Sequence, residues 1–202
     1  MMFCTNCLKE ILPDQGQWLE MPDGSKFLCN QCADLILKRG GNKLDEEKKI
    51  LDAADSCYKK RDYKKAIDLY KRVVKINPRS TYTWFLIGES YGKLEMFQEA
   101  IPCLKKALEI DPKEIKALYL LGLSYGYLEK PEEAISYLKQ VIELNPAYEF
   151  TWYYLGWLYD MQENLQEAIS CFKKAIQINP KDERALSGLG RVLSKRKESK
   201  KI

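Results

Sequence analysis

The sequence predicts an all-α chain of stacked helical hairpins, preceded by a small module that is built on four cysteines. The first observation is a period of 34 residues, seen in the series Gly88, Gly122, Gly156 and Gly190. The second is an Asn or Asp followed by proline in each copy, at Pro78, Pro112, Pro146 and Pro180. The third is a pair of Cys-x-x-Cys motifs before residue 33. A period of this length indicates units that bury their apolar faces by stacking.

The amino-terminal cysteines have the spacing of a metal site. Cys4 and Cys7 form one pair, and Cys29 and Cys32 form the second pair after 21 intervening residues. Four thiolates complete a closed tetrahedron around Zn²⁺ and leave no position for a catalytic water. The sequence therefore predicts one structural zinc ion, whose binding coincides with folding of the module.

The residues around the cysteines predict the order of elements in this module. Residues 17–20 and 26–29 read as short strands joined by a turn at 22–24. Residues 33–38 read as a helix that is ended by the glycine pair at 40–41. This is the order of a treble clef, which we expect over residues 1–40, with a linker over 41–46.

The run Cys29-x-x-Cys32-x-Asp34-Leu35, which opens the expected helix, resembles the zinc-binding domain that precedes the ClpX unfoldase motor. The resemblance covers about forty residues, and it implies dimerisation and the binding of adaptors and substrates. Redox-active pairs and disulfides are the alternatives for these cysteines. No thioredoxin-like βαβ pattern is predicted next to these cysteines, which disfavours a redox-active role. No secretory signal precedes Lys9, so we expect a reducing cytoplasmic setting in which disulfides are disfavoured.

Each repeat copy carries the apolar spacing of two packed helices. Trp84, Ile87, Gly88 and Tyr91 lie three, four and seven residues apart, as one face of a helix requires. A second stripe follows at Ala100, Leu104 and Ala107, on a helix antiparallel to the first. Small side chains at Gly88 and Ala100 allow the two backbones to approach closely, and the residue before each proline ends the second helix.

This pattern resembles the tetratricopeptide repeat (TPR) family. The resemblance implies four repeats, a solvating end helix and a basic tail, at residues 47–80, 81–114, 115–148, 149–182, 183–197 and 198–202 respectively. Two features depart from it. Cys57 replaces the tyrosine of the later copies, and Pro102 falls inside a helix, where a kink costing ~3 kcal/mol is expected. Like Cys103 and Cys171, Cys57 reads as a small packing residue.

A second face of the first helix in each repeat carries the candidate partner-binding residues. It consists of the second, fifth, ninth and thirteenth places of the copy, about half a turn from the packing stripe. The candidate binding residues on this face are Tyr82, Phe85, Tyr119, Leu123, Tyr127, Phe150, Tyr153 and Trp157. In the TPR family this side lines a groove that holds extended peptides or a helix. The alternative is that these rings cover one another or pack under the amino-terminal module.

Composition excludes several functions. The chain has no histidine, no Gly-rich phosphate loop and no nucleophile set, so we expect no enzyme. The TPR clamp for chaperone carboxyl termini is also not expected, because Leu51 and Asp55 replace two of its residues. An apolar or aromatic-rich protein segment is the expected ligand.

The charge distribution bears on the other partners. The formal charge is only +4, and residues 191–202 alone carry +5. We read this basic end as a solubilising cap, with nucleic-acid binding through it as the alternative. No apolar run is long enough to span a membrane.

Beside binding of a partner protein and binding of nucleic acid, a third possible function is self-assembly, in which the zinc module or the groove pairs copies of the chain.

Overall fold

The computed structural model describes the backbone at residues 2–3, 10–11, 16–17, 28–148 and 150–199, and side chains at residues 43–148 and 150–198. The chain divides into two compact units, Met1–Asp52 and Ala53–Ile202. The helices are α1 (Asn30–Lys59), α2 (Tyr63–Ile76), α3 (Thr81–Lys93), α4 (Phe97–Ile110), α5 (Ile115–Tyr127), α6 (Pro131–Leu144), α7 (Thr151–Met161), α8 (Leu165–Ile178) and α9 (Glu183–Ser199).

The amino-terminal unit contains two short antiparallel strand pairs within its described residues. Strand β1 (Met2–Phe3) pairs with β2 (Glu10–Ile11), and β3 (Gly16–Gln17) pairs with β4 (Leu28–Cys29). The pairing of Gln17 with Leu28 agrees with the hairpin expected over 17–20 and 26–29.

The helix after this hairpin is longer than the sequence indicates. We expected it to end at Gly40-Gly41 and a linker to follow at 41–46, but α1 continues through both segments to Lys59. A glycine inside a helix costs roughly 1 kcal/mol relative to alanine. Residues 43–52 are mostly Lys, Leu, Asp and Glu, and the strong helix formers among them extend the helix past that cost.

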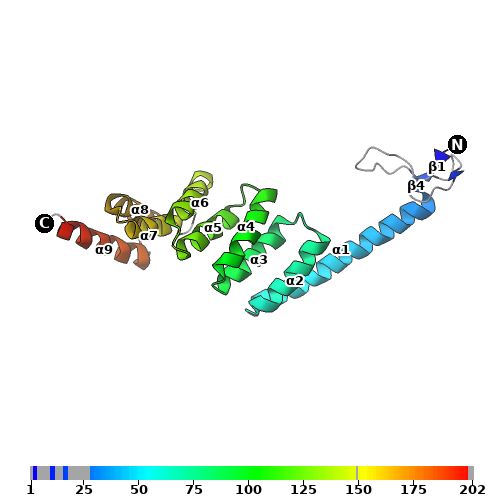
Figure 1. The fold of residues 1–202 in the computed structure, drawn as a ribbon, viewed down its shortest axis with the longest axis horizontal. Coiled ribbons are helices and arrows are strands. Elements are labelled where there is room, and N and C mark those ends of the chain that lie inside the picture. The colour runs from blue at the N-terminus through cyan, green and yellow to red at the C-terminus, as the bar shows by residue number, and fades with distance from the viewer. Residues whose placement is uncertain (1, 4–9, 12–15, 18–27, 149, 200–202) are drawn as a thin grey trace. The chain divides into compact units, whose positions relative to one another are not determined.

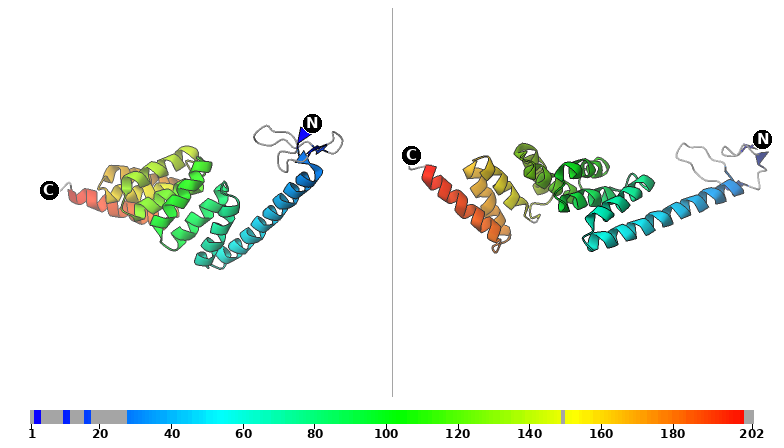
Figure 2. Two further views of the ribbon diagram at one scale, coloured as in Figure 1. Left: turned by 45° about the vertical axis from the view of Figure 1, so that its right-hand side comes forward. Right: turned by 60° about the horizontal axis from the view of Figure 1, so that its bottom comes forward.

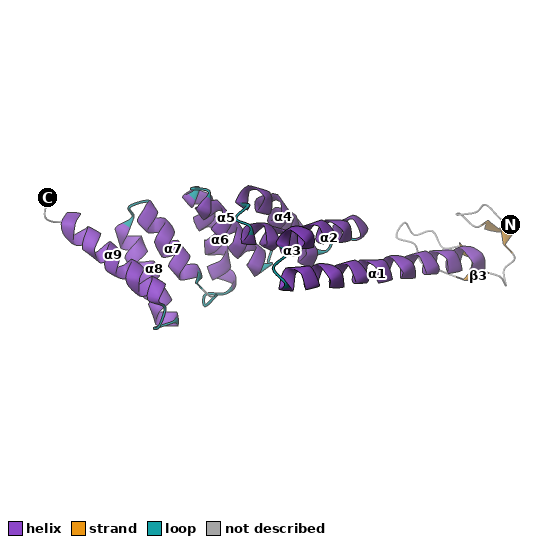
Figure 3. Ribbon diagram, turned by 90° about the horizontal axis from the view of Figure 1, so that it is seen from below, coloured by secondary structure: helices purple, strands orange, loops and turns teal. Residues whose placement is uncertain are grey.

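The carboxyl-terminal unit is a succession of helical hairpins, as Figure 1 and Figure 2 show for residues 81–178. Helices α3 and α4, α5 and α6, and α7 and α8 pair within the repeats, and α8 packs on α9. The first helices also contact one another from repeat to repeat, α3 with α5, α5 with α7, and α7 with α9. These contacts make α3, α5, α7 and α9 one continuous inner layer. Figure 3 shows the helices of this unit in purple, joined by short teal loops.

The expected ends of the second helices are confirmed. Asn77, Asp111, Asn145 and Asn179 are the C-cap residues of α2, α4, α6 and α8. The Asn145 side-chain oxygen accepts from the Ala147 backbone N–H at 3.1 Å, a local turn of the kind that Asx residues favour. Between repeats, the Trp152 indole N–H donates to the Pro146 carbonyl at 2.8 Å.

The glycines of the packing stripe allow close approach of the two helices, as expected, in three of four copies. A Cβ added at Gly88 or Gly122 would lie 2.6 Å from the Leu104 or Leu138 side chain, so the helices could not pack as they do. Gly190 differs, because no atom lies within 4 Å of its added Cβ. No hairpin partner follows α9 in the described chain, and α9 instead approaches α8 through Gly188, beside the Phe172 ring.

Pro102 lies within α4, which continues through it from Phe97 to Ile110. Proline lacks the N–H that would bond to the Gln98 carbonyl one turn earlier. Both Gln98 and Pro102 are exposed, so water can reach that carbonyl. The helix therefore tolerates the proline on its solvent side.

Candidate partner-binding groove

The inner helices α3, α5 and α7, together with Phe150 just before α7, carry the eight residues that the sequence predicts for the groove. Tyr82 and Tyr127 are more than half exposed, at 54% and 51%. The partly buried members are Tyr119, Leu123, Phe150, Tyr153 and Trp157. Phe85 was placed wrongly on this accessible face, since it is only 7% exposed. Its ring lies 5.9 Å from the Lys116 ammonium at the start of α5 and belongs to the packed layer.

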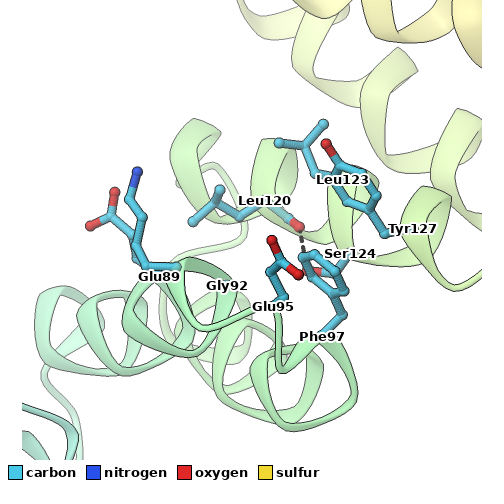
Figure 4. A pocket seen from close by; sticks show the side chains of 9 residues that line it. Glu89, Gly92, Glu95, Phe97, Leu120, Leu123, Ser124 and Tyr127 are labelled. Atoms are coloured by element: carbon cyan, nitrogen blue, oxygen red, sulfur yellow. Dashed lines mark hydrogen bonds between the residues drawn. The ribbon is translucent and has the colours of Figure 1, made fainter. Parts of the chain in front are cut away.

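A first cavity, of about 340 Å³, lies where α3 and its turn into α4 face α5. Leu123 and Tyr127 line it from α5, and Glu95 and Phe97 line it from the turn and the start of α4 (Figure 4). Its other lining residues are Glu89, Gly92, Lys93, Leu120 and Ser124. We call this the α3–α5 cavity; it is apolar at its α5 wall and carries two carboxylates at the opposite wall.

Two further cavities continue along the same inner face. The central cavity, of about 310 Å³, is lined by Tyr127, Tyr153, Tyr154, Trp157 and Arg184. The α7–α9 cavity, of about 280 Å³, is lined by Tyr153, Glu183, Arg184, Ser187, Gly188 and Arg191. Tyr127 borders the first two cavities, and Tyr153 and Arg184 border the last two. The three cavities thus adjoin one another across α3, α5, α7 and α9, and we call them together the groove.

The aromatic side chains of the groove contact one another and still keep accessible area. Tyr127 stacks on Phe97 with ring centroids 4.8 Å apart, and the Trp157 ring centroid lies 6.0 Å from that of Tyr127. Tyr119 makes an edge contact with Tyr154 at 5.9 Å. The alternative in which the rings cover one another is therefore partly correct. The contacts hold the rings in place, and Tyr127 remains 51% exposed.

Tyr154 supplies a neutral hydroxyl at the floor of the central cavity. Burial, followed by the neighbouring Tyr127 hydroxyl, raises the pKa of Tyr154 to about 12. The group is therefore protonated throughout the physiological range and can both donate and accept a hydrogen bond. The groove combines apolar ring faces with hydroxyl groups, which suits an extended protein segment.

The last helix adds basic groups to one end of the groove. The Asp160 carboxylate, 5% exposed, accepts from Arg191 and Lys195 at 2.7 Å each, and these contacts join α7 to α9. Arg196 contacts Gln166 of α8 at 3.3 Å. Three basic residues of the carboxyl-terminal segment that motivated the nucleic-acid alternative thus bind this chain's own side chains. Helix α9 also extends two residues beyond the expected end at 197.

The sequence analysis missed several groove residues. Arg184 and Arg191 occupy the second and ninth places of the end helix, so extending the repeat register into α9 would have found them. Phe97 begins a second helix, and Tyr154 follows the fifth place of its copy. No periodic signal distinguishes these two from packing residues.

The four cysteines that the sequence predicts as zinc ligands stand apart from the groove in sequence. Cys4 and Cys7 lie outside the residues that the structure describes, and for Cys29 and Cys32 it describes the backbone alone. Cys29 ends β4, and Cys32 lies in the first turn of α1. The strand precedes the helix as expected, but α1 begins at Asn30, three residues before the expected start at residue 33.

The three remaining cysteines are free thiols. Burial raises the pKa of Cys171 to about 11 and also raises the pKa of Cys103. These two are poor nucleophiles at neutral pH, in keeping with packing residues.

Known proteins resemble the chain in its helical part. Residues 81–114, 115–148 and 150–182 match one tetratricopeptide repeat model, and residues 50–80 match another. A crystal structure of the MamA protein is 30% identical, covers 73% of this chain and 81% of its own, and superposes with a TM-score of 0.70. MamA from Desulfovibrio magneticus RS-1 is 22% identical, with 78% and 89% covered and a TM-score of 0.74.

Another similar structure is YrrB, described as a TPR protein with an unusual peptide-binding site. It is 22% identical, covers 73% of this chain and 76% of its own, and has a TM-score of 0.65. No curated protein sequence matches the chain significantly. Within the described residues, no helix has the length and apolar character needed to cross a membrane. The repeat matches cover residues 50–182 apart from residue 149, and the chain therefore belongs to the tetratricopeptide repeat family.

Proposed function

We propose that this protein is a non-enzymatic adaptor or scaffold whose groove receives a segment of a partner protein. The observation that carries the proposal is the line of adjoining cavities along α3, α5, α7 and α9, bordered by Tyr127, Tyr153 and Trp157. A row of accessible rings on a folded surface is typical of an interaction site. The peptide-binding site named for YrrB supports the same use of this fold.

The energetics favour an apolar or aromatic-rich segment as the ligand. Burying one large apolar side chain contributes ~1.5–3 kcal/mol, so a few anchors offset the cost of association. Tyr and Trp are the side chains that most often dominate such interfaces. The rings of the groove already contact one another, so ordering them costs little further entropy on binding.

The amino-terminal module would supply a second function in this proposal. Its four cysteines would hold one structural Zn²⁺, and the folded module would provide a docking or dimerisation surface. The two Cys-x-x-Cys pairs and the β4-to-α1 order at Cys29 and Cys32 support this reading. A cytoplasmic location suits it, because zinc thiolates and the free thiols of the repeats both persist in a reducing compartment.

The groove proposal predicts the result of an affinity purification from lysate of the source cells. Tyr127→Ala combined with Trp157→Ala should abolish capture of the partner, because each truncation removes an accessible ring at the centre of the groove. A loss of ~2–4 kcal/mol in total, about 30-fold or more in Kd, is expected. Quantitative mass spectrometry of the captured proteins makes the measurement.

The matched control is Leu144→Ala, which removes an exposed apolar side chain, 40% exposed, from the end of α6. It should leave capture unchanged, and both variants should retain wild-type helicity. Equal capture by wild type and the double variant would place the binding surface elsewhere.

A further inference from the structure

Arg184 is the charged residue most closely built into the groove. It lies in the first turn of α9 and lines both the central and the α7–α9 cavities. Its guanidinium carbon lies 4.1 Å from the Phe150 ring centroid and 5.2 Å from that of Tyr153. Stacking on two rings fixes the plane of the guanidinium and leaves its edge available for hydrogen bonds.

The ion pair of Arg184 within the described residues is long and uses its Nε atom. Among the described residues, Asp182 is its recorded ion-pair partner, with Oδ1 3.6 Å from Nε. The same oxygen accepts from the backbone N–H groups of Arg184 and Ala185 at 3.1 and 3.3 Å, so it is held at the start of α9. The Arg184 side chain is 47% exposed. The fork of the guanidinium can therefore bind a second carboxylate from a ligand.

The neighbouring charges reinforce this basic end. Arg191 and Lys195 both contact the Asp160 carboxylate, at 2.7 Å each. Glu183 is the one carboxylate that lines the α7–α9 cavity. At the other end of the groove, Glu89 and Glu95 line the α3–α5 cavity with Lys93. The charged side chains that line the groove are thus two carboxylates and one ammonium group at the α3 end, and two guanidinium groups and one carboxylate at the α9 end.

Phe150, which supports Arg184, has an unusual backbone. It is the N-cap residue of α7 with φ of 60°, a left-handed conformation that a bulky side chain rarely adopts. The other non-glycine residues of positive φ in the described part of the chain recur at one place of the repeat, at Arg61, Glu95, Glu129 and Glu163. Phe150 is the exception to this periodicity, and its ring forms one platform of the guanidinium.

We propose that the groove ligand presents an Asp or Glu side chain to Arg184, next to an apolar or aromatic side chain in the central cavity. This inference rests on the proposed function and adds the chemistry of the partner. The ligand carboxylate and the Arg184 guanidinium would form a charge-assisted, bidentate pair, and the ring-bearing side chain would contact Tyr127 and Trp157. The acidic residue sets which segments bind and in which direction they lie.

A displayed library of random dodecapeptides, selected on the full-length protein, tests this proposal. The wild type should enrich peptides that combine an aromatic residue with an Asp or Glu. Arg184→Gln should retain the aromatic preference and lose the acidic one, and Arg184→Glu should shift the charged position to Lys or Arg. Tyr127→Ala with Trp157→Ala should lose the aromatic preference. The melting temperatures of all variants should match that of the wild type.

A peptide synthesised from the selected consensus allows the contribution of the carboxylate pair to be measured, as the difference in Kd between the wild type and the Arg184 variants. Changing its acidic residue to the amide should weaken binding to the wild type at least about tenfold and leave Arg184→Gln unaffected. Arg184→Lys should fall between the two, because it keeps the charge and loses the planar fork.

Different results would overturn the acidic-ligand inference and the proposed function of the groove. Aromatic enrichment without an acidic residue, or an acidic preference that Arg184→Gln keeps, would overturn this inference and leave the proposed function in place. Enrichment that does not depend on Tyr127 and Trp157, or no enrichment, would overturn the proposed function itself.

Discussion

Replacing Phe172 with alanine should lower the free energy of unfolding by about 3–5 kcal/mol, the largest stability loss we expect from one substitution in the repeats. The Phe172 ring is fully buried in the last core cluster. It fills the space that two glycines leave, since a Cβ at Gly156 or Gly188 would lie 2.8 or 2.7 Å from the ring. Removing the ring leaves a cavity between α7, α8 and α9 that these helices cannot close.

Urea unfolding followed by circular dichroism measures this effect. Phe172→Leu is the matched control, because leucine occupies the equivalent place at Leu104 and Leu138, and it should cost under about 1.5 kcal/mol. Because each repeat contacts mainly its neighbours, hydrogen exchange should rise first in α7 to α9. A loss below about 1 kcal/mol for the alanine variant would show that Phe172 does not hold these helices together.

Removal of zinc should unfold the amino-terminal module. We expect one zinc ion per chain by elemental analysis, because four thiolates complete the site. Structural zinc contributes ~10–16 kcal/mol of binding free energy in small domains, far more than a module of about forty residues can obtain from its apolar core. Chelation should therefore abolish hydrogen-exchange protection over residues 1–40 and leave that of residues 63–178 unchanged.

The zinc content of single cysteine variants distinguishes the predicted zinc ligands from the cysteines that pack within the repeats. Cys32→Ser should lose the metal, whereas Cys57→Ser, on the repeat side of α1, should retain one zinc ion per chain. Zinc content that is equal in the two variants, or protection of residues 1–40 that survives chelation, would contradict the assignment of Cys4, Cys7, Cys29 and Cys32.

The repeat fold could be predicted because its signals are local and recur. The glycine at Gly88 and Gly122, the Asn or Asp before each proline, and the 34-residue period all describe contacts between adjacent helices. The same signals mislead at the ends of the array. Gly190 continues the glycine series, but within the described residues no atom lies within 4 Å of its added Cβ, and Gly188 takes over the contact with α8.

The groove was predicted less completely, because helix periodicity gives the direction of a side chain but not its exposure. Phe85 and Tyr119 occupy the same place of successive copies, yet Phe85 is buried and Tyr119 remains partly accessible. The start of α7 is another example. It begins at Thr151, two residues later in its copy than α3 and α5, because Phe150 adopts a left-handed backbone. That conformation has no signature in the sequence.

Site-specific photo-crosslinking tests the central claim most directly. A benzophenone amino acid placed at Leu123, which lines the α3–α5 cavity, should cross-link to the captured partner in the source cells. The same group at Leu144, exposed at the end of α6, should not. Cross-linking from position 144 with none from position 123 would contradict the account, since it would place the partner on the outer helices and leave the groove empty.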